Sequence, residues 1–564
     1  MNPHSLSKKR ELGAYYTPSE LSKVLADWAI HSIEEDVLEP SFGGCGFFES
    51  SINRFNELGS HNPKDRIYGV DIDKHAFDIL GAKYKTLVNL NSRFILQDFL
   101  QVKPSDFSVD GFDVVIGNHP YVSMHNMTEK QRESCEKILL NSPFAHETMG
   151  RNASLWAFFL LHSLDFLKDE GRVAWVLPCS LLHANYAEKL LSFYQAHFQK
   201  IKIVKLAERF FRDEGAKETS VILLAEGFKR VPRRKKGNLY INTADNVEQL
   251  IESIERLEDG TSTNIRDYKL DLIPPPAKLA YQTLQRKSCI VSLGDLADIK
   301  IGMVTGANNV FIVDKKTVDY YQLPDEVLKP VVARFNSLQG LMHNKCRHKE
   351  SVKNNSRAYL VCPTVEQMQD VNSAVYRYLS QITEQARKEN RTFKKRPHWF
   401  SPGWGIDGLK ADCFLSYMIH RGPRLVINAN KQFNCTNSIH KVIFRERVSA
   451  AKKSAIAITM FSSLTQLSAE IEGRAYSSGV LKIEPSAGRQ LKLLISDECI
   501  DTLVALKEQV ELELKLGNHR AITDIVDNAL IGQGLISQEQ SENFRMAIIA
   551  LRKERYKGSQ KYYD

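Results

Sequence analysis

The residues of this chain best suited to chemistry are Asn118-His119-Pro120-Tyr121, which directly follow the apolar run 112–117. An amide oxygen and a backbone carbonyl held by a proline turn can both accept hydrogen bonds from one NH2 group, which draws the nitrogen lone pair out of conjugation. An aromatic ring beside them can stack on a flat base. The four residues therefore predict a site for a planar exocyclic amine where a strand ends; the alternative for so short a motif is an ordinary turn.

Three earlier segments have the pattern of short apolar strands that end in an acidic residue. The first ends at Glu39-Pro40 and continues into a turn that contains Gly43, where the backbone can approach a ligand before a helix begins. The second ends at Asp71, at the distance where a doubly wound fold places a ribose-binding carboxylate, and the third ends at Asp98. Each acid alone is more often a solvated turn or a helix N-cap, so the prediction of one shared site rests on their order.

This succession of motifs resembles the gamma-class (TaqI-like) DNA adenine-N6 methyltransferases of restriction-modification type, and the resemblance covers nearly the whole chain. The segment 13–18 is similar to the family's opening cofactor motif, and the segment 39–46 is similar to its methionine-binding loop. The resemblance implies S-adenosyl-L-methionine as the cofactor and no metal. The residues that it implies for cofactor binding are Tyr16, Thr17, Glu39, Pro40, Gly43, Asp71, Asp98 and Asn118.

The resemblance also implies roles in catalysis. Asn118 and the His119 carbonyl would orient the amine of a flipped-out adenine, while Tyr121 and one phenylalanine would clamp its ring. The catalytic set that it implies is Asn118, His119, Pro120, Tyr121, Phe210 and Phe211. His119 departs from the family, which normally has proline there; histidine keeps the carbonyl but loses the fixed φ of the ring. Two alternatives stay open: a noncatalytic DNA-binding component that keeps the cofactor pocket, and an amine methyltransferase that acts on RNA or protein.

Strands alternate with helices from residue 20 to residue 225, which predicts an α/β fold: a Rossmann-like, doubly wound methyltransferase domain whose parallel sheet is covered on both faces. Within it, the apolar segment 155–167 is expected to form a buried core helix. A mixed α+β target-recognition domain with a helical C-terminus is expected to follow. The predicted boundaries are 10–228 for the S-adenosylmethionine-dependent methyltransferase domain, 229–290 for a connector with basic and proline-rich stretches, 291–495 for the target-recognition (DNA-binding) domain and 496–564 for the C-terminal helical region.

Two features of the second half predict double-stranded DNA as a partner. The segment 293–309 resembles the start of the family's target-recognition domain. Farther on, a basic cluster with aromatic neighbours has the composition of a surface that binds phosphates and supports bases, although a solvated basic loop is the alternative. The predicted DNA-binding residues of this cluster are Arg387, Lys388, Arg391, Lys394, Lys395 and Arg396.

Composition sets wider limits on the chain. Its 564 residues are 43% hydrophobic and carry a formal net charge of +9, which predicts two or three domains but is too modest by itself to establish a polyanionic partner. No segment has the length of a membrane span or the pattern of a secretion signal. Nine cysteines without a paired framework indicate reduced thiols, so the expected location is cytoplasmic (nucleoid-associated).

Several cysteine and histidine residues are expected to have no role in chemistry. Cys45 is expected to be a small space filler rather than a nucleophile. His343, Cys346 and His348 are expected to be surface residues, because no second ligand cluster at zinc-like spacing accompanies them. The methyltransferase motifs begin within the first twenty residues, so a restriction endonuclease partner is expected to be separately encoded.

Overall fold

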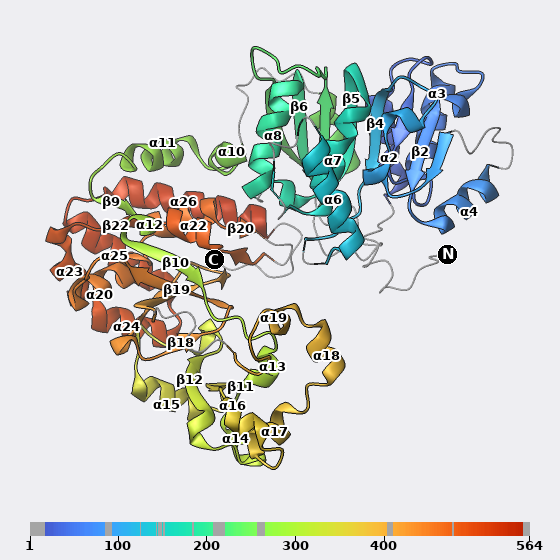
Figure 1. Cartoon of the computed structure of the whole chain (residues 1–564). Helices are drawn as coiled ribbons and strands as arrows, with labels where there is room; N and C mark the ends of the chain where they lie inside the picture. The colour runs from blue at the N-terminus through green and yellow to red at the C-terminus, as the bar shows by residue number, and fades with distance from the viewer. Residues whose placement is uncertain are drawn as a thin grey trace. The chain divides into compact units, whose positions relative to one another are not determined.

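The computed structural model describes residues 17–84, 93–124, 126–142, 144, 149–150, 153–182, 185–206, 220–255, 265–402, 410–475 and 479–556. The chain divides into two compact units, Met1–Tyr268 and Lys269–Asp564 (Figure 1). Within the described ranges, no helix combines the length and the apolar character that crossing a membrane requires. The four domain ranges predicted from the sequence remain predictions.

The first unit is built around one sheet. Its strands are β1 (Val37–Glu39), β2 (Ile67–Asp71), β3 (Phe94–Leu96), β4 (Phe112–Asn118), β5 (Leu167–Pro178), β6 (Lys200–Leu206), β7 (Ser220–Glu226) and β8 (Asn238–Ala244). Their order is β3-β2-β1-β4-β5-β7-β6-β8; the pairs from β3 to β5 are parallel, and β7 runs antiparallel to both neighbours. The strand order reverses between β1 and β4. The predicted doubly wound α/β fold is confirmed, and this reversal is where such folds bind ligands.

Helices and 3-10 turns connect these strands. They are α2 (Ser19–Ala29), α3 (Gly46–Glu57), η1 (Pro63–Arg66), α4 (Lys74–Lys83), η2 (Phe99–Gln101), η3 (Pro104–Asp106), α6 (Glu129–Asn141), α7 (Leu155–Ser163), η5 (Leu164–Phe166), η6 (Cys179–Leu182), α8 (Asn185–His197) and α9 (Val247–Glu255). Helices α2, α3, α4 and α9 share one hydrophobic core with the sheet, to which they contribute Leu21, Phe48, Leu80 and Leu250. All residues of α7 are buried, as expected of a core helix. Strand β8 lies within the range predicted as a connector, and its parallel pairing with β6 makes it an edge of this sheet.

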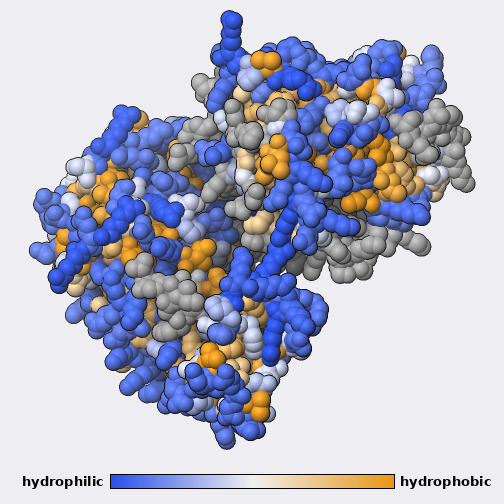
Figure 2. All heavy atoms as spheres, in the orientation of Figure 1, coloured by the Kyte–Doolittle hydropathy of each residue, from blue (hydrophilic) through white to orange (hydrophobic). Residues whose placement is uncertain are grey.

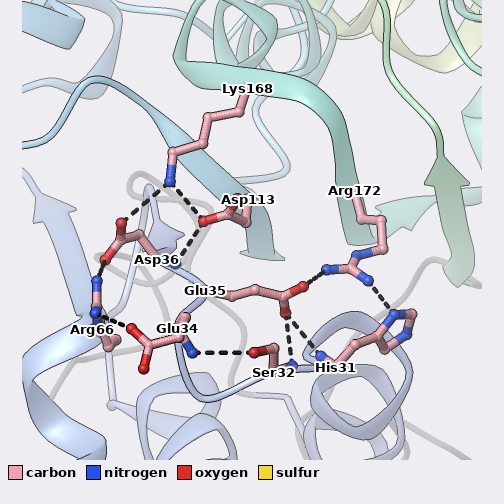
Figure 3. Close-up of polar contacts among 9 residues, drawn as sticks. All are labelled: His31, Ser32, Glu34, Glu35, Asp36, Arg66, Asp113, Lys168 and Arg172. Atoms are coloured by element: carbon pink, nitrogen blue, oxygen red, sulfur yellow. Dashed lines mark hydrogen bonds and ion pairs between the residues drawn. The ribbon is translucent and has the colours of Figure 1, made fainter.

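A polar network holds the amino ends of β1, β4 and β5 together (Figure 3). Lys168 Nζ lies 2.7 Å from Asp113 Oδ2 and 3.3 Å from Asp36 Oδ2. The Asp36 amide donates to Asp113 Oδ2 over 2.9 Å, and Arg66 lies 3.3 Å from the other Asp36 oxygen. Charges of both signs therefore satisfy one another at this end of the sheet. The network fixes β1 relative to β4, and with them the residues that follow the opposite, carboxyl ends of these strands.

The second unit is mixed α+β. Its strands are β9 (Ile290–Ser292), β10 (Ala297–Ile301), β11 (Ile312–Val313), β12 (Leu328–Val332), β13 (Met342–His343), β14 (Tyr359–Val361), β15 (Cys413–Ser416), β16 (Met418–Ile419), β17 (Leu425–Asn428), β18 (Asn434–Cys435), β19 (Ile439–Phe444), β20 (Arg474–Ala475), β21 (Leu481–Lys482) and β22 (Lys492–Leu494). Among the described residues they form a five-stranded sheet, β10-β19-β15-β17-β13, a four-stranded sheet, β11-β14-β12-β18, and two smaller ones. Strand β10 thus lies at an edge, where the loop that follows it can reach solvent.

Helices surround these sheets and form the last part of the chain that the structure describes. They are α10 (Ile265–Asp271), α11 (Pro275–Leu284), α12 (Leu293–Leu296), α13 (Asn308–Phe311), α14 (Lys315–Tyr321), η8 (Asp325–Val327), η9 (Phe335–Ser337), α15 (Lys345–Lys353), α16 (Val365–Gln369), α17 (Ala374–Leu379), α18 (Glu384–Glu389), α19 (Arg391–Lys394), η10 (Ala429–Lys431), α20 (Ala450–Thr459), α21 (Ser463–Glu472), α22 (Pro485–Gln490), η11 (Asp497–Cys499), α23 (Ile500–Ala505), α24 (Lys507–Leu516), α25 (His519–Gly532) and α26 (Gln538–Arg555). The expected helical C-terminus is confirmed. A buried ion cluster joins α21 to α26, because Glu470 accepts from Arg552 Nε at 3.1 Å and from Arg555 Nε at 2.8 Å.

The expectation that His343 and His348 lie at the surface is wrong. They are 1% and 8% exposed, and their ring centroids lie 4.6 and 4.8 Å from that of Phe433. Burial, followed by the neighbouring His348, lowers the pKa of His343 to about 4, so this imidazole is neutral at pH 7. Of the three residues only Cys346 is exposed. The part of the chain that the structure describes holds no group of three side chains able to share a metal ion.

Candidate functional site

A cavity of about 280 Å3 opens at the carboxyl ends of β1, β2 and β4. Its lining combines acidic groups, backbone of the glycine-rich turn and apolar side chains. Of the residues predicted from the sequence, those that line it are Thr17, Glu39, Pro40, Gly43, Asp71, Asp98, Asn118 and Pro120. Segments far apart in the sequence therefore meet at the point where the strand order reverses.

Two of the acids are buried at the base of this cavity. Glu39 is 3% exposed and Asp71 is 7% exposed. Asp71 accepts from the Gly43 and Asp73 amides, each at 2.8 Å, whereas Glu39 Oε2 has no hydrogen-bond partner within the described ranges. Burial, together with the charge of Asp71, raises the pKa of Glu39 well above its ordinary value; burial also raises that of Asp71. Glu39 is thus a carboxyl group that a cationic ligand could ionise and satisfy.

The glycine-rich turn between β1 and α3 bends through left-handed backbone conformations. Gly43 has φ 45°, and Cys45, at the N-cap of α3, has φ 66°. A left-handed φ is inexpensive for glycine, and a Cβ built on Gly43 meets nothing within 4 Å, so the backbone lies open toward the cavity. Burial raises the pKa of the Cys45 thiol to about 12, which agrees with its interpretation as a filler rather than a nucleophile.

Asp98 is held by a set of donors after β3. Its Oδ1 accepts from the Leu100 amide at 3.1 Å, and its Oδ2 accepts from Ser134 Oγ at 2.8 Å and Gln101 Nε2 at 3.4 Å. Ser134 comes from α6, so the carboxylate is fixed between two elements. A carboxylate held in this way can present a lone pair to a ligand amine without first reorganising.

Asn118 ends β4 beside the first described residue of the chain. Its Nδ2 donates to Thr17 Oγ1 at 3.1 Å, and both side chains line the cavity. Because the amide nitrogen is engaged by a hydroxyl 101 residues away, the side-chain rotation of Asn118 is fixed. Asn118 and Pro120 therefore border the same space.

His119 turns its side chain away from the cavity and into the core. The ring is 1% exposed, 3.8 Å between centroids from Trp175 and 5.1 Å from Phe159. Neither ring nitrogen has a hydrogen-bond partner in the described part of the chain, and burial lowers the pKa of His119 well below its ordinary value. The imidazole is therefore a neutral packing group, and His119 is not among the residues that line the cavity.

The remaining predicted residues lie elsewhere or cannot be placed. Tyr121 is half-buried, is absent from the cavity lining, and approaches Ser220 at the start of β7 with 3.3 Å between Oη and Oγ. Tyr16, Phe210 and Phe211 lie outside the described residues.

Apolar side chains that the sequence interpretation did not select also line the cavity, among them Ile72, Phe99 and Phe159. Ile72 is 61% exposed although apolar, and Phe99 and Phe159 pack with centroids 5.3 Å apart. Ile72 and Phe99 directly follow Asp71 and Asp98, so the residue after each acidic strand end was an available signal. Phe159 comes from α7, and its contribution depends on tertiary packing.

The basic cluster of the second unit divides into two groups. Arg387 lies over the Trp399 ring at 3.9 Å, and Arg396 donates to the Thr305 carbonyl at 3.0 Å, so both are partly used in packing. The other four residues are exposed, and we call them the basic face: Lys388, Arg391, Lys394 and Lys395. Figure 2 shows hydrophilic side chains, in blue, over the region of α18 and α19. Such a surface suits a polyanion.

Family comparisons agree with this geometry. Residues 1–269 match the model of the N-6 DNA methylase family, and residues 267–531 match that of the Type II methyltransferase M.Eco57I C-terminal domain. The Type II methyltransferase M.AccI of Acinetobacter calcoaceticus is 23% identical over 93% of this chain and 94% of its own length. M.HindII of Haemophilus influenzae is 26% identical over 54% of this chain and 56% of its own length.

Solved structures extend the likeness in fold. The Type IIL restriction-modification enzyme MmeI, solved in complex with DNA, is 12% identical with a TM-score of 0.54, over 98% of this chain and 80% of that one. At this identity the similarity concerns the fold alone. Together the two family models extend from residue 1 to residue 531. The chain therefore belongs to the adenine-specific DNA methyltransferases of restriction-modification type, with an N-6 DNA methylase domain followed by a C-terminal domain of the M.Eco57I kind.

Proposed function

We propose that this chain transfers a methyl group from S-adenosyl-L-methionine to the N6 amine of an adenine that has been flipped out of double-stranded DNA. One observation carries the proposal: a single cavity gathers Glu39, Asp71, Asp98 and Asn118 at the reversal of the strand order. These are acceptor groups at separated positions around one space. A ligand with an amino group, a ribose and an aromatic amine has donors to match them.

The residues present fit the cofactor. Glu39, whose Oε2 is buried without a partner in the described ranges, would hold the amino group, and Asp71 would hold the ribose hydroxyls. Asp98 would accept from the adenine amine of the cofactor, and Ile72 offers an apolar face beside it. When bound, the cofactor supplies a methyl group on a positively charged sulfur. A buried acid such as Glu39 would stabilise a cationic group of the cofactor, because charges interact strongly at low dielectric.

The residues that end β4 act on the target amine. The Asn118 oxygen and the carbonyl of His119 would accept its two N–H bonds, which leaves the nitrogen lone pair free to attack. Thr17 keeps the Asn118 amide oriented through the 3.1 Å hydrogen bond to Oγ1. Tyr121 would stack on the base after leaving its contact with Ser220, and Phe210 or Phe211 would close the other face. A strong base is unnecessary, because the amine becomes acidic once it is methylated.

DNA must be held firmly enough to release one base from its stack. Extrusion costs a few kcal/mol, which stacking and amine hydrogen bonds in the pocket offset. The basic face, supported by Arg387 and Arg396, would bind the backbone through phosphate contacts. A separately encoded restriction endonuclease is the proposed biological partner, and both proteins would act at cytoplasmic, nucleoid DNA.

Methylation-aware sequencing tests this function. Genomic DNA is compared from a host without other methyltransferases that expresses either the natural chain or Asn118→Ala. N6-methyladenine at one defined motif, absent with the variant, is the expected result. Equal methylation by the variant would overturn the site assignment. Absence of any modified base with soluble natural protein would overturn the proposed reaction on DNA.

A further inference from the structure

Two separate loops of the second unit are joined into one rigid surface feature. The loop after β10 contains Met303, whose amide donates to the Cys435 carbonyl at 2.8 Å and whose carbonyl accepts from the Asn437 amide at 2.9 Å. The preceding Gly302 amide donates to the Ile439 carbonyl at 3.0 Å. Main-chain hydrogen bonds from Gly302 and Met303 thus hold the β10 loop against the turn between β18 and β19.

Side chains of these loops form a directed chain of hydrogen bonds. The Ala307 amide donates to Thr305 Oγ1 at 3.2 Å, and Thr305 Oγ1 donates to Asn308 Oδ1 at 2.5 Å. Asn308 Nδ2 then donates to Asn437 Oδ1 at 3.0 Å. Each side-chain acceptor along this relay takes a hydrogen bond from within the protein, and the last group, Asn437 Nδ2, is a donor without an acceptor among the described residues. Asn308 and Asn437 are exposed, whereas Thr305 is fully buried. We call Thr305, Asn308 and Asn437 the amide relay.

Helix α19 is fixed against the same loop (Figure 1 shows it beside α13). Arg396 donates to the carbonyls of Thr305 and Val304, and Asn390 Nδ2 donates to that of Gly306 at 2.9 Å. Phe393 packs so closely on Gly306, which has φ +82°, that a Cβ there would lie 2.6 Å from the ring. The start of the target-recognition segment and the basic cluster, separated by about 90 residues in sequence, are one packed structure.

This structure presents donors and cations together. Lys394 of α19 and Lys395, which follows the helix, are exposed, and neither has a carboxylate partner in the parts of the chain that the structure describes. Glu384 is the ion-paired acid closest to these two lysines in the sequence, and its partner is Lys388, with 2.7 Å between Oε1 and Nζ. A base edge in DNA offers donors and acceptors in mixed patterns, whereas a phosphate offers acceptors only. A relay whose side-chain acceptors each already take a hydrogen bond, and whose last donor has no acceptor among the described residues, matches the phosphate.

We propose that the amide relay is a docking point for a DNA backbone phosphate, with Asn437 Nδ2 as the hydrogen-bond donor and Lys394 and Lys395 as the adjacent cations. This inference rests on the proposed function, because it takes duplex DNA as the ligand. The Asn437 donor would add a neutral hydrogen bond of fixed position to the charge interactions of the exposed basic face. Its role is positioning: it registers the duplex on the second unit without reading the sequence.

The test compares Asn437→Ala, which removes the donor, with Asn437→Asp, which keeps the shape but replaces the donor by a negative charge. Asn372→Asp is the matched control, since Asn372 is also exposed in the second unit and lies outside the relay. Binding of the full chain is measured by fluorescence anisotropy on two unmethylated duplexes of equal length. One contains the sequence motif that the chain methylates, and the other lacks it. We expect Asn437→Ala to weaken binding roughly fivefold on both duplexes, Asn437→Asp by on the order of 50-fold, and Asn372→Asp hardly at all.

Three outcomes would overturn the inference. Unchanged binding by both Asn437 variants shows that no phosphate docks there. A loss confined to the duplex that contains the motif makes Asn437 a base-reading residue instead. An equal loss for Asn372→Asp makes the effect a general consequence of added negative charge. The anisotropy experiment measures binding without methyl transfer. It can therefore contradict this inference while the natural chain still methylates DNA. Conversely, the sequencing experiment can contradict the proposed function while binding still depends on the relay.

Discussion

The cavity of the first unit and the basic face of the second unit use charge in opposite ways. In the cavity, Glu39 and Asp71 are buried, and burial raises both pKa values. On the basic face, Lys394 and Lys395 are exposed cations without carboxylate partners in the described ranges. Buried charges act strongly over short distances, whereas exposed charges are screened by salt and act by their number. Ligand affinity at the cavity should therefore depend on pH and on the positions of the side chains. DNA affinity at the basic face should depend on ionic strength.

The largest expected effect lies at the cavity. Asn118→Ala removes the amide oxygen that orients the target amine, so we expect kcat to fall on the order of 1,000-fold. Cofactor affinity should stay nearly unchanged, because Glu39, Asp71 and Asp98 remain. Single-turnover methylation and equilibrium binding of the cofactor measure the two quantities separately.

Thr17→Val provides the matched control for that change. It removes the hydroxyl that accepts from Asn118 Nδ2 at 3.1 Å and leaves the amide in place. We expect a smaller loss of kcat, about tenfold, because the amide is still present but less well oriented. A loss as large as that of Asn118→Ala would mean that Thr17 itself acts on the substrate.

Salt dependence is the second test of the contrast. Replacing Lys388, Lys394 and Lys395 together by glutamine should weaken DNA binding about 10-fold to 100-fold at ~0.1 M salt and flatten the dependence of log Kd on log salt by ~0.9 for each phosphate that the variant no longer neutralises. Cofactor binding should not change. Titrations of DNA at several salt concentrations give the slope.

Arg396→Gln separates folding from binding within the same cluster. Its guanidinium is half-buried and donates to the Thr305 carbonyl at 3.0 Å, so we expect a loss of about 1–2 kcal/mol in the free energy of unfolding. If the triple lysine variant kept the natural salt slope while Arg396→Gln lost it, the division of the cluster into packing and binding residues would be wrong.

The sequence predicted the position of the cavity well because parallel strands bring their carboxyl ends to one edge. Glu39, Asp71, Asp98 and Asn118 each end or follow a strand, so strand order alone places them together. Side-chain direction is a different matter. His119 follows Asn118 directly, yet its ring lies in the core against Trp175 from β5. No local pattern encodes that contact, because it depends on how a distant strand packs.

The same limit applies to the basic cluster. Spacing identified its six cations, but not that Arg387 covers Trp399 or that Arg396 reaches back to Thr305. The buried histidines His343 and His348 were misjudged for a related reason. Their neighbours in sequence are polar, and only the tertiary contact with Phe433 makes their surroundings apolar.

Cofactor binding should depend on pH through Glu39. Its pKa is raised by burial and by Asp71, so over a range above its ordinary value of 4.5 the free protein keeps a proton that a bound cation displaces. Cofactor affinity should therefore rise with pH through that range, by up to about tenfold per pH unit, and level off above the raised pKa. Glu39→Gln should bind more weakly at high pH and show a flat profile. Calorimetry in two buffers of different ionisation enthalpy measures the proton released; equal heats in both would contradict the linkage.

The smallest expected effect concerns stability at the border between cavity and core. His119→Phe keeps an aromatic ring against Trp175 and removes two buried nitrogens that lack partners in the described ranges, so we expect the free energy of unfolding at about pH 7 to rise by about 1 kcal/mol. His119→Pro, which introduces the residue usual in the family, should lower it by about 2 kcal/mol because the ring's packing is lost. The pKa of His119 lies well below 6.5 in the folded chain, so below pH 6.5 the unfolded chain binds a proton that the folded chain does not. The free energy of unfolding therefore decreases as the pH is lowered below 6.5. Denaturant titrations at about pH 7 and about pH 5 should show a smaller acid-induced loss for His119→Phe than for the natural chain; an identical loss would mean that His119 is not buried as a neutral ring.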